Sequence, residues 1–254
     1  MNLKSSSGPG PPAHDETRRQ LLEAAGEVFA QTGFRNATVR EICRRAGANV
    51  AAVNYHFGDK ESLYAEVLRD SQQKAFEKYP PLLGVAADAP PEEKLRAFIR
   101  SFLLRIFDSG SSTRFGKIMS REMVEPTGAL ELLLEGRIRP MADQLRGLVA
   151  EILGGPPEDE EVRLCCFSIV SQCVFFHHCR IMITRLFPEQ RLDASAVEPL
   201  AGHIARFSLA AMKHLSDPET PGFKPGRALP RGVAEVRMRR KPAELTPRGK
   251  RRRP

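Results

Sequence analysis

The chain of 254 residues has no apolar stretch near the roughly 18 residues that a membrane-spanning helix requires. Its N-terminal segment, MNLKSSSGPGPPAH, also lacks the short apolar region of an export signal. These two absences predict a cytoplasmic protein without a membrane partner.

Motifs of common enzyme classes are absent as well. The sequence contains no glycine-rich phosphate loop, no HExxH pair and no GxSxG element. Ser71-Gln72-Gln73-Lys74 matches the SxxK pattern of acyl-serine enzymes, but a pattern with so few fixed positions occurs by chance in many chains. We therefore expect no enzyme activity and no cofactor.

Cysteine is too scarce and too unevenly placed for a secreted disulfide framework. The chain has five, an odd number, and four of them lie between residues 165 and 179. A metal site would have to use the neighbours Cys173, His177, His178 and Cys179, but the CxxC spacing typical of ligands is missing. A redox trigger would use Cys165, Cys166 and Cys173. Because cysteine is among the most buried residue types, we expect packing rather than metal binding or redox chemistry.

Positive charge is concentrated in one part of the chain. The formal net charge is +8, from 39 Lys and Arg against 31 Asp and Glu. Residues 216–254 alone hold 12 Lys and Arg against 4 Asp and Glu, which accounts for the whole excess. This segment also carries seven prolines and no helical periodicity, so we expect it to be disordered. It is either a solubilising extension or an electrostatic arm for nucleic acid.

Apolar residues recur at helical spacing through most of the chain, whereas strand signals are almost absent. The pattern predicts an all-α fold with helices over residues 17–32, 39–46, 50–57, 59–79, 92–108, 114–124, 128–153, 158–186 and 195–215. Pro140 lies inside the seventh of these ranges, so we expect it to kink or break that helix.

The segment 38–60, TVREICRRAGANVAAVNYHFGDK, predicts two short helices joined by a tight turn. Thr38 is a good N-cap with Glu41 three residues later, which forms a capping box. Gly47 can adopt the positive φ that ends a helix, and Asn49 can cap the next one. This helix–turn–helix arrangement suits DNA binding.

The second short helix has two different faces. Val53 and Phe57 share one face and are expected to bury against Ile42. The opposite face presents Val50, Ala51, Asn54 and Tyr55. Such a small and nearly uncharged face fits a major groove, where bulk would clash and acidic side chains would be repelled. The basic residues that flank it and are expected to meet phosphates are Arg40, Arg44, Arg45 and Lys60.

Residues 17–68 resemble the TetR/AcrR family of transcriptional regulators. The resemblance rests on TRRQLLEAAGEVFAQTGFRNAT, the turn glycine, NYHF and KESLY, in that order. It implies that the DNA contacts come from Thr38, Arg40, Asn49, Val50, Ala51, Asn54, Tyr55, His56 and Lys60. Asn54 departs from the family, which usually has an aromatic residue there.

The segment 164–187, LCCFSIVSQCVFFHHCRIMITRLF, is apolar on nearly every side, so it must be buried in its own domain or against a second subunit. Together with residues 195–215 it is similar to the helix pair that forms a four-helix dimer interface in the TetR family. The C-terminal half also resembles the CecR-type subgroup, in REMVEP at 121–126 and RIRP at 137–140.

The expected organisation is a disordered segment 1–14, a DNA-binding domain over 15–75, a ligand-binding and dimerisation domain over 90–215, and the disordered basic tail 216–254. The resemblance predicts a homodimeric repressor that a small-molecule effector releases from a near-palindromic double-stranded DNA operator. The effector itself is not identified. Adaptable side chains expected near an effector cavity, or else simply in the core, are Phe102, Ile106, Met119, Met123, Phe175 and Met182. The alternative function is a constitutive nucleoid-type or architectural DNA binder driven by the tail.

Overall fold

The computed structural model describes residues 13–107 and 112–216, and every regular element within these ranges is helical. The predicted all-α fold is confirmed. The basic tail, apart from Ser216, and residues 1–12 of the predicted disordered N-terminus lie outside the described residues.

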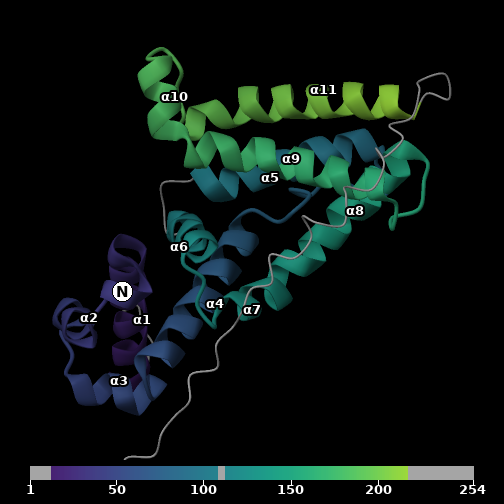
Figure 1. Ribbon diagram of the computed structural model, residues 1–254. Coiled ribbons are helices and arrows are strands. Elements are labelled where there is room, and N and C mark those ends of the chain that lie inside the picture. The colour runs from purple at the N-terminus through teal and green to yellow at the C-terminus, as the bar shows by residue number, and fades with distance from the viewer. Residues whose placement is uncertain (1–12, 108–111, 217–254) are drawn as a thin grey trace, which may run out of the picture. The chain divides into compact units, whose positions relative to one another are not determined.

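The N-terminal part consists of four helices: α1 (Ala13–Asn36), α2 (Val39–Ala46), α3 (Val50–Phe57) and α4 (Lys60–Lys78). Helix α1 begins at Ala13 rather than at residue 17, and Gly33, with φ of 79°, interrupts it close to its predicted end. Helices α1, α2 and α3 contact one another, and both α1 and α3 contact α4. Figure 1 shows α4 running from α3 toward the C-terminal helices.

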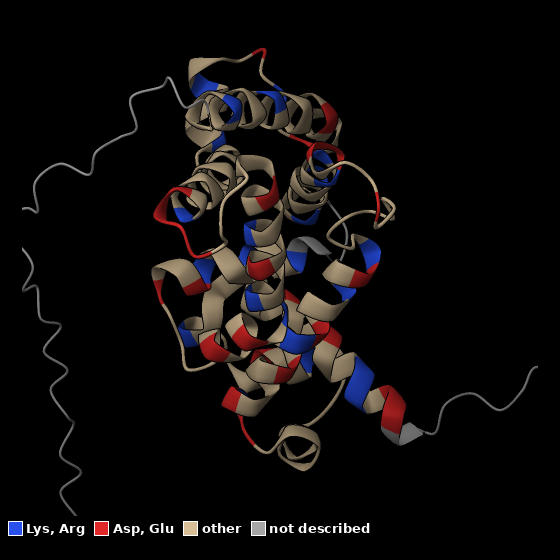
Figure 2. Cartoon of the chain, turned by 90° about the vertical axis from the view of Figure 1, so that its right-hand side faces the viewer, with Lys and Arg blue, Asp and Glu red and all other residues tan. Residues whose placement is uncertain are grey.

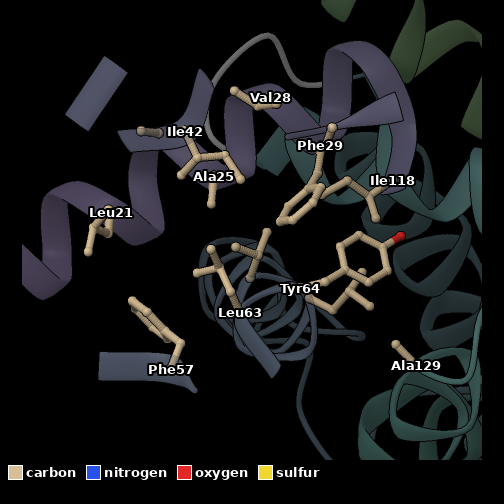
Figure 3. Close-up of a cluster of buried hydrophobic side chains, with 14 of the residues drawn as sticks. Leu21, Ala25, Val28, Phe29, Ile42, Phe57, Leu63, Tyr64, Ile118 and Ala129 are labelled. Atoms are coloured by element: carbon tan, nitrogen blue, oxygen red, sulfur yellow. The ribbon is translucent and has the colours of Figure 1, made fainter. Parts of the chain in front are cut away.

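The core of this part does not stop at α4. Leu21, Phe29 and Ile42 are fully buried in it, as the amphipathic pattern predicted. The same cluster continues into the C-terminal half through Ile118 and Ala129 (Figure 3). The core of the N-terminal part therefore includes residues of the C-terminal part, with α6 against α1 and α4, and α7 against α4.

The C-terminal part contains α5 (Pro91–Phe107), α6 (Ser112–Val124), α7 (Leu130–Leu133), a π-helical stretch (Leu134–Ile138), α8 (Arg139–Leu153), α9 (Glu160–His178), α10 (Arg180–Leu186), a short 3₁₀ turn (Ala194–Ala196) and α11 (Val197–Leu215). Helix α5 is central, because α6, α8, α9 and α11 all contact it. Its residues Leu95, Ile99 and Leu103 are fully buried in a second apolar cluster.

Pro140 does not break its helix. The chain stays helical from Leu130 to Leu153, and Pro140 is the second residue of α8, directly after the π-helical stretch. In a continuous α-helix the proline ring would clash with the carbonyl four residues earlier. The wider π-helical turns before Pro140 leave room for its ring and avoid this clash.

The single helix predicted over residues 158–186 is two helices. Helices α9 and α10 meet at Cys179 and are bent by 71°. Among the described residues no single helix is both long and apolar enough to cross a membrane, and this pair reaches that composition only across its bend. No proline or glycine stands at the break, so the local sequence carries no signal for it.

Candidate nucleic-acid interface and apolar cavity

The turn between α2 and α3 is fixed by hydrogen bonds of its own residues. The Thr38 hydroxyl oxygen accepts from the Glu41 amide at 3.2 Å and caps α2. Gly47 adopts φ of 63°, the left-handed conformation that costs other residues about 1–2 kcal/mol. The Ala48 amide then donates to the Cys43 carbonyl at 3.0 Å, which closes the helix end.

Helix α3 is held with one face inward and one face outward. The Asn49 side-chain oxygen caps it by accepting from the Ala52 amide at 2.9 Å. Val53 and Phe57 are buried in the core shared with Ile42. The outward face is formed by Val50, Ala51, Asn54 and Tyr55, all of them exposed. In Figure 2, α3 is the lowest helix in the view and shows no charged residue.

None of the nine predicted DNA-contact residues is buried. Thr38 and Arg40 lie at the start of α2, and Lys60 lies at the start of α4. The other six run from the cap of α3 to its last turn: Asn49, Val50, Ala51, Asn54, Tyr55 and His56. Tyr55 has 75% of its surface exposed. The nine residues therefore lie on α3 and at the starts of α2 and α4, and Figure 1 shows α3 at the end of the four-helix part that faces away from the C-terminal helices.

The two arginines at the end of α2 differ from Arg40. Arg44 and Arg45 both donate to the Glu41 carboxylate, at 2.8 and 2.7 Å. These hydrogen bonds hold the pKa of Glu41 at about 2. Arg40 is exposed and makes no hydrogen bond or ion pair with the described residues. Arg40 therefore remains available to a phosphate, whereas Arg44 and Arg45, predicted to meet phosphates too, are neutralised in part by Glu41.

Lys60 connects the DNA-facing end to the C-terminal half through aromatic rings. Its ammonium lies 4.5 Å from the centre of the Phe34 ring, and that ring lies 4.9 Å from the ring of Tyr64. The Tyr64 hydroxyl donates to the carboxylate of Glu122 on α6 at 2.5 Å. Burial raises the pKa of Tyr64, and the hydrogen bond to Glu122 raises it further.

Glu122 is a buried acid, with 1% of its surface exposed. Besides the Tyr64 hydroxyl, its carboxylate accepts from the backbone amide of Thr127 at 2.9 Å. A buried carboxylate requires such donors, because an unpaired one costs several kcal/mol. This group therefore fixes α4 against α6 at the level of the second turn of α4.

An apolar cavity of about 360 Å³ lies among the C-terminal helices. Its walls come from α4, α5, α6, α8 and α9 and the π-helical stretch, through Phe76, Phe98, Phe102, Arg105, Ile106, Phe115, Gly116, Met119, Ser120, Met123, Ile138, Met141, Ala142, Leu145, Cys166, Phe167, Val170, Val174, His177 and His178. Four of the six residues predicted near an effector are among them. Phe175 and Met182 are not; both are about half exposed outside the cavity.

Large apolar side chains remain exposed on the last three helices. They are Leu164, Phe167 and Phe175 on α9, Ile181, Met182 and Leu186 on α10, Phe187 after it, and Phe207 on α11. Helix α9 contacts both α10 and α11, so these residues belong to adjoining elements. We call them the α9–α11 apolar surface. A monomer in water rarely keeps so many large apolar groups exposed together.

Known protein families match both parts of the chain. The family described as bacterial regulatory proteins, tetR family, matches residues 21–67, which contain α2 and α3. The family described as HTH-type transcriptional dual regulator CecR, C-terminal domain, matches residues 91–212, which span α5 to near the end of α11. The dual regulator CecR of Shigella flexneri is 31% identical over 171 residues, 64% of this chain and 76% of CecR.

The chain belongs to the TetR family of DNA-binding transcriptional regulators. The transcriptional repressor KstR2 of Mycolicibacterium smegmatis is 36% identical over 95 residues, 37% of this chain and 46% of KstR2. The fatty acid degradation regulator FadR of Bacillus halodurans has a similar structure, with a TM-score of 0.53 at 18% identity over 79% of this chain and 97% of FadR. HlyIIR, a hemolysin II transcriptional regulator, also has a similar structure, with a TM-score of 0.51 at 21% identity over 75% of this chain and 97% of HlyIIR. The two structures share the TetR-family fold with this chain.

A second, more polar cleft of about 940 Å³ lies on the other side of α6 in this TetR-family chain. Its lining includes Arg35 at the end of α1, Lys117 and Arg121 on α6, and Asp193 before α11. His177 lines both the cleft and the apolar cavity. Burial lowers the pKa of His177, which favours its neutral form at physiological pH. Ile106, Ser120 and His178 line both spaces as well, so the more polar cleft and the apolar cavity adjoin each other.

The cysteines of the chain are free thiols. Burial raises the pKa of Cys166 to about 11 and that of Cys173 to about 12. Because the thiolate is the reactive and metal-binding form, these environments disfavour the redox trigger considered above. Within residues 13–107 and 112–216, no group of three or more His, Cys, Asp or Glu is placed to hold a metal ion.

The sequence did not reveal that two charged residues are buried inside the TetR-family fold, Glu122 and Arg105. Glu122 entered the sequence comparison only as part of REMVEP, and Arg105 was not singled out. Arg105 did carry a signal, because it stands alone in the apolar run FLLRIF, three residues after Phe102 on an inward-facing stripe. A lone charge on such a stripe indicates a buried polar site.

Proposed function

We propose that this regulator is a homodimeric repressor whose two α3 helices enter successive major grooves of a near-palindromic operator. The observation that carries the proposal is the outward face of α3. It is exposed, small and uncharged, and it lies between Arg40 and Lys60, which lie at the starts of α2 and α4. A groove-reading helix needs such a face, with cations at its edges for the phosphates.

Each residue of this interface is assigned a role by its chemistry. Val50 and Ala51 are suited to thymine methyl groups, and the Asn54 amide is suited to adenine. Phosphate contacts are assigned to Arg40, Tyr55, His56 and Lys60, which set the register without reading the sequence. The side-chain oxygens of Thr38 and Asn49 already cap their helices, so these residues act mainly by orienting α2 and α3.

We further propose that a small molecule in the apolar cavity releases the operator. Helix α4 supports this coupling, since it begins at Lys60 beside the DNA-facing end and carries Phe76 on the cavity wall. It also contacts α6 and α7, which line or border the cavity. An effector that binds better to a second arrangement of α4 shifts the population toward it by its difference in affinity.

The interface is tested with a DNA duplex selected by the wild-type protein from a randomised pool. Lys60→Ala should weaken binding to all duplexes alike and reduce the salt slope by about one unit. Asn54→Ala should instead change which base is preferred. Lys117→Ala is the matched control, because it removes one positive charge from the exposed side of α6. Footprints of Lys60→Ala and Asn54→Ala identical to that of the wild type would contradict the assigned face.

A further inference from the structure

Arg105 is a buried cation on the wall of the apolar cavity. Only 4% of its surface is exposed, and it lies on α5 among residues that otherwise form the second apolar cluster. The described lining of the cavity contains no Asp, Glu or Lys, and Arg105 is its one arginine. A full positive charge therefore stands beside a nearly apolar space.

The protein satisfies this guanidinium only in part. Its Nη1 donates to the backbone carbonyl of Tyr79 and to the Ser101 hydroxyl, both at 2.6 Å. Its Nη2 donates to the Met141 sulfur at 3.2 Å, and its plane lies 4.4 Å from the centre of the Phe76 ring. None of these partners is an anion, and Arg105 forms no ion pair with any described carboxylate.

Two hydrogen-bond donors of Arg105 are left without an acceptor among the described residues. A guanidinium carries five N–H groups, and the three bonds above leave the one on Nε and one of the two on Nη2. Nε and Nη2 form one edge of the guanidinium, the geometry that binds a carboxylate through two parallel hydrogen bonds.

Arg105 keeps its positive charge although it is buried, and a buried charge is unfavourable. Burial lowers the pKa of Arg105 to about 10, so the group remains a cation at neutral pH. Arg105 has no counter-ion among the described residues, which is unfavourable for a buried cation, and the carbonyl end of α4 supplies only the partial negative charge of a helix C-terminus. An anion in the cavity would complete the site.

We propose that the effector is an amphipathic anion, with an apolar body in the cavity and a carboxylate or similar anionic head paired to Arg105. This inference rests on the proposed release of the operator by a small molecule and names the chemical class of that molecule. It also supplies a route to the DNA-binding part. The same guanidinium holds the carbonyl of Tyr79, directly after α4, and Lys60 stands at the other end of that helix.

The test compares three probes that share one alkyl chain and differ in the charge of the head group: decanoate, decan-1-ol and decan-1-amine. Isothermal titration calorimetry with the full chain should find decanoate bound about 10- to 100-fold more tightly than decan-1-ol, because a charge-assisted hydrogen bond replaces an unpaired cation. Decan-1-amine should bind most weakly, since its cation would face Arg105.

Substitutions separate the charge of Arg105 from its packing. Arg105→Met should remove the preference for decanoate over decan-1-ol, whereas Arg105→Lys should keep a weaker preference, because an ammonium retains the charge without the fork. Arg96→Met, on the exposed side of the same helix, is the matched control and should behave like the wild type. Circular dichroism measures whether each variant is folded. If Arg105→Met does not fold, the affinities of Arg105→Lys and of the wild type for the three probes still test the inference.

The inference is overturned if wild-type protein does not bind decanoate, or binds it no more tightly than decan-1-ol. A gel shift with the selected duplex distinguishes this failure from failure of the proposed function. Release by decan-1-ol as readily as by decanoate keeps effector release and overturns the need for an anion. Arg105-dependent binding of decanoate that leaves the duplex bound supports the anion site and contradicts effector release.

Discussion

The outward face of α3 and the α9–α11 apolar surface are both exposed and consist of uncharged side chains, but those side chains differ in size. Val50, Ala51 and Asn54 are short, and only Tyr55 extends from the α3 face. The α9–α11 apolar surface instead presents phenylalanines, with Phe207 60% exposed. A short, uncharged face fits a groove lined by base edges, whereas large apolar groups gain most from contact with another apolar surface.

The energetic consequences of the two surfaces differ as well. Burial of one large apolar side chain contributes about 1.5–3 kcal/mol. An association that covers the α9–α11 apolar surface would therefore gain its free energy mainly from apolar burial. The α3 face has little apolar area to bury, and its affinity for DNA must come from phosphate contacts and base hydrogen bonds. Side-chain size, together with flanking cations, therefore distinguishes a DNA-binding surface from a protein-binding surface when both consist of uncharged side chains.

The largest effect is expected when charges are placed on the α9–α11 apolar surface. We expect the double variant Phe175→Glu/Phe207→Glu to be a monomer, because two carboxylates would have to be desolvated in a dimer. Operator affinity should fall by about 100-fold or more, since two half-sites then no longer act together. Sedimentation velocity measures the first effect, and a gel shift with the selected duplex measures the second.

Leu132→Glu is the control for this experiment. Leu132 is also a partly exposed apolar residue, but it lies on α7 outside the α9–α11 apolar surface. Its substitution should leave the protein dimeric. A wild-type protein that sediments as a folded, monodisperse monomer would contradict both the dimer and the palindromic operator.

The DNA-binding part was predictable from sequence because local interactions determine it. Thr38 and Asn49 each cap a helix by accepting from the amide three residues later, and Gly47 adopts the positive φ at which it was expected. Interactions between residues close together in the chain are the ones that a single sequence reveals most directly. The inward positions of Val53 and Phe57 also followed from helical spacing alone.

The C-terminal part was less predictable because residues distant in sequence determine its details. No proline or glycine marks the bend at Cys179, and the one proline near the π-helical stretch, Pro140, does not by itself specify π-helical turns. Phe102 and Phe175 were both expected near an effector cavity because of their residue type. Phe102 lines the apolar cavity and Phe175 does not, a difference that residue type could not reveal because α9 is apolar on nearly every side. The partner of Glu122 is 58 residues away, a contact that no local pattern contains.

A second prediction tests whether the two parts depend on each other through Tyr64. Tyr64→Phe removes the hydroxyl that donates to buried Glu122 and leaves that carboxylate with its Thr127 donors. We expect a loss of about 1–3 kcal/mol in the free energy of unfolding, because the acceptor is charged and buried. Urea denaturation measures the loss.

The matched control is Tyr79→Phe, because the Tyr79 hydroxyl makes no hydrogen bond with the described residues and its ring is partly exposed. This variant should change the unfolding free energy by less than about 0.5 kcal/mol. Equal stability of Tyr64→Phe and Tyr79→Phe would show that the Tyr64–Glu122 bond contributes little to joining the DNA-binding and C-terminal parts.

The smallest expected effect concerns the basic segment 217–254, which lies outside the described residues and whose role is predicted from charge alone. Truncation after Ser216 removes 12 Lys and Arg against 4 Asp and Glu. We expect a loss of about tenfold in DNA affinity at low ionic strength that fades as salt rises, because the segment would act by releasing counterions from phosphates. Nonspecific and operator binding should fall by similar factors, while dimerisation and the preferred sequence stay unchanged, since the α3 face and the α9–α11 apolar surface remain.

Gel shifts over a salt series with selected and scrambled duplexes measure operator binding and nonspecific binding. Equal binding of truncated and full-length protein at low salt would reduce the segment to a solubilising extension. Loss of all sequence-selective binding on truncation would instead favour an architectural DNA binder driven by this segment, and would remove the α3 face from its central place.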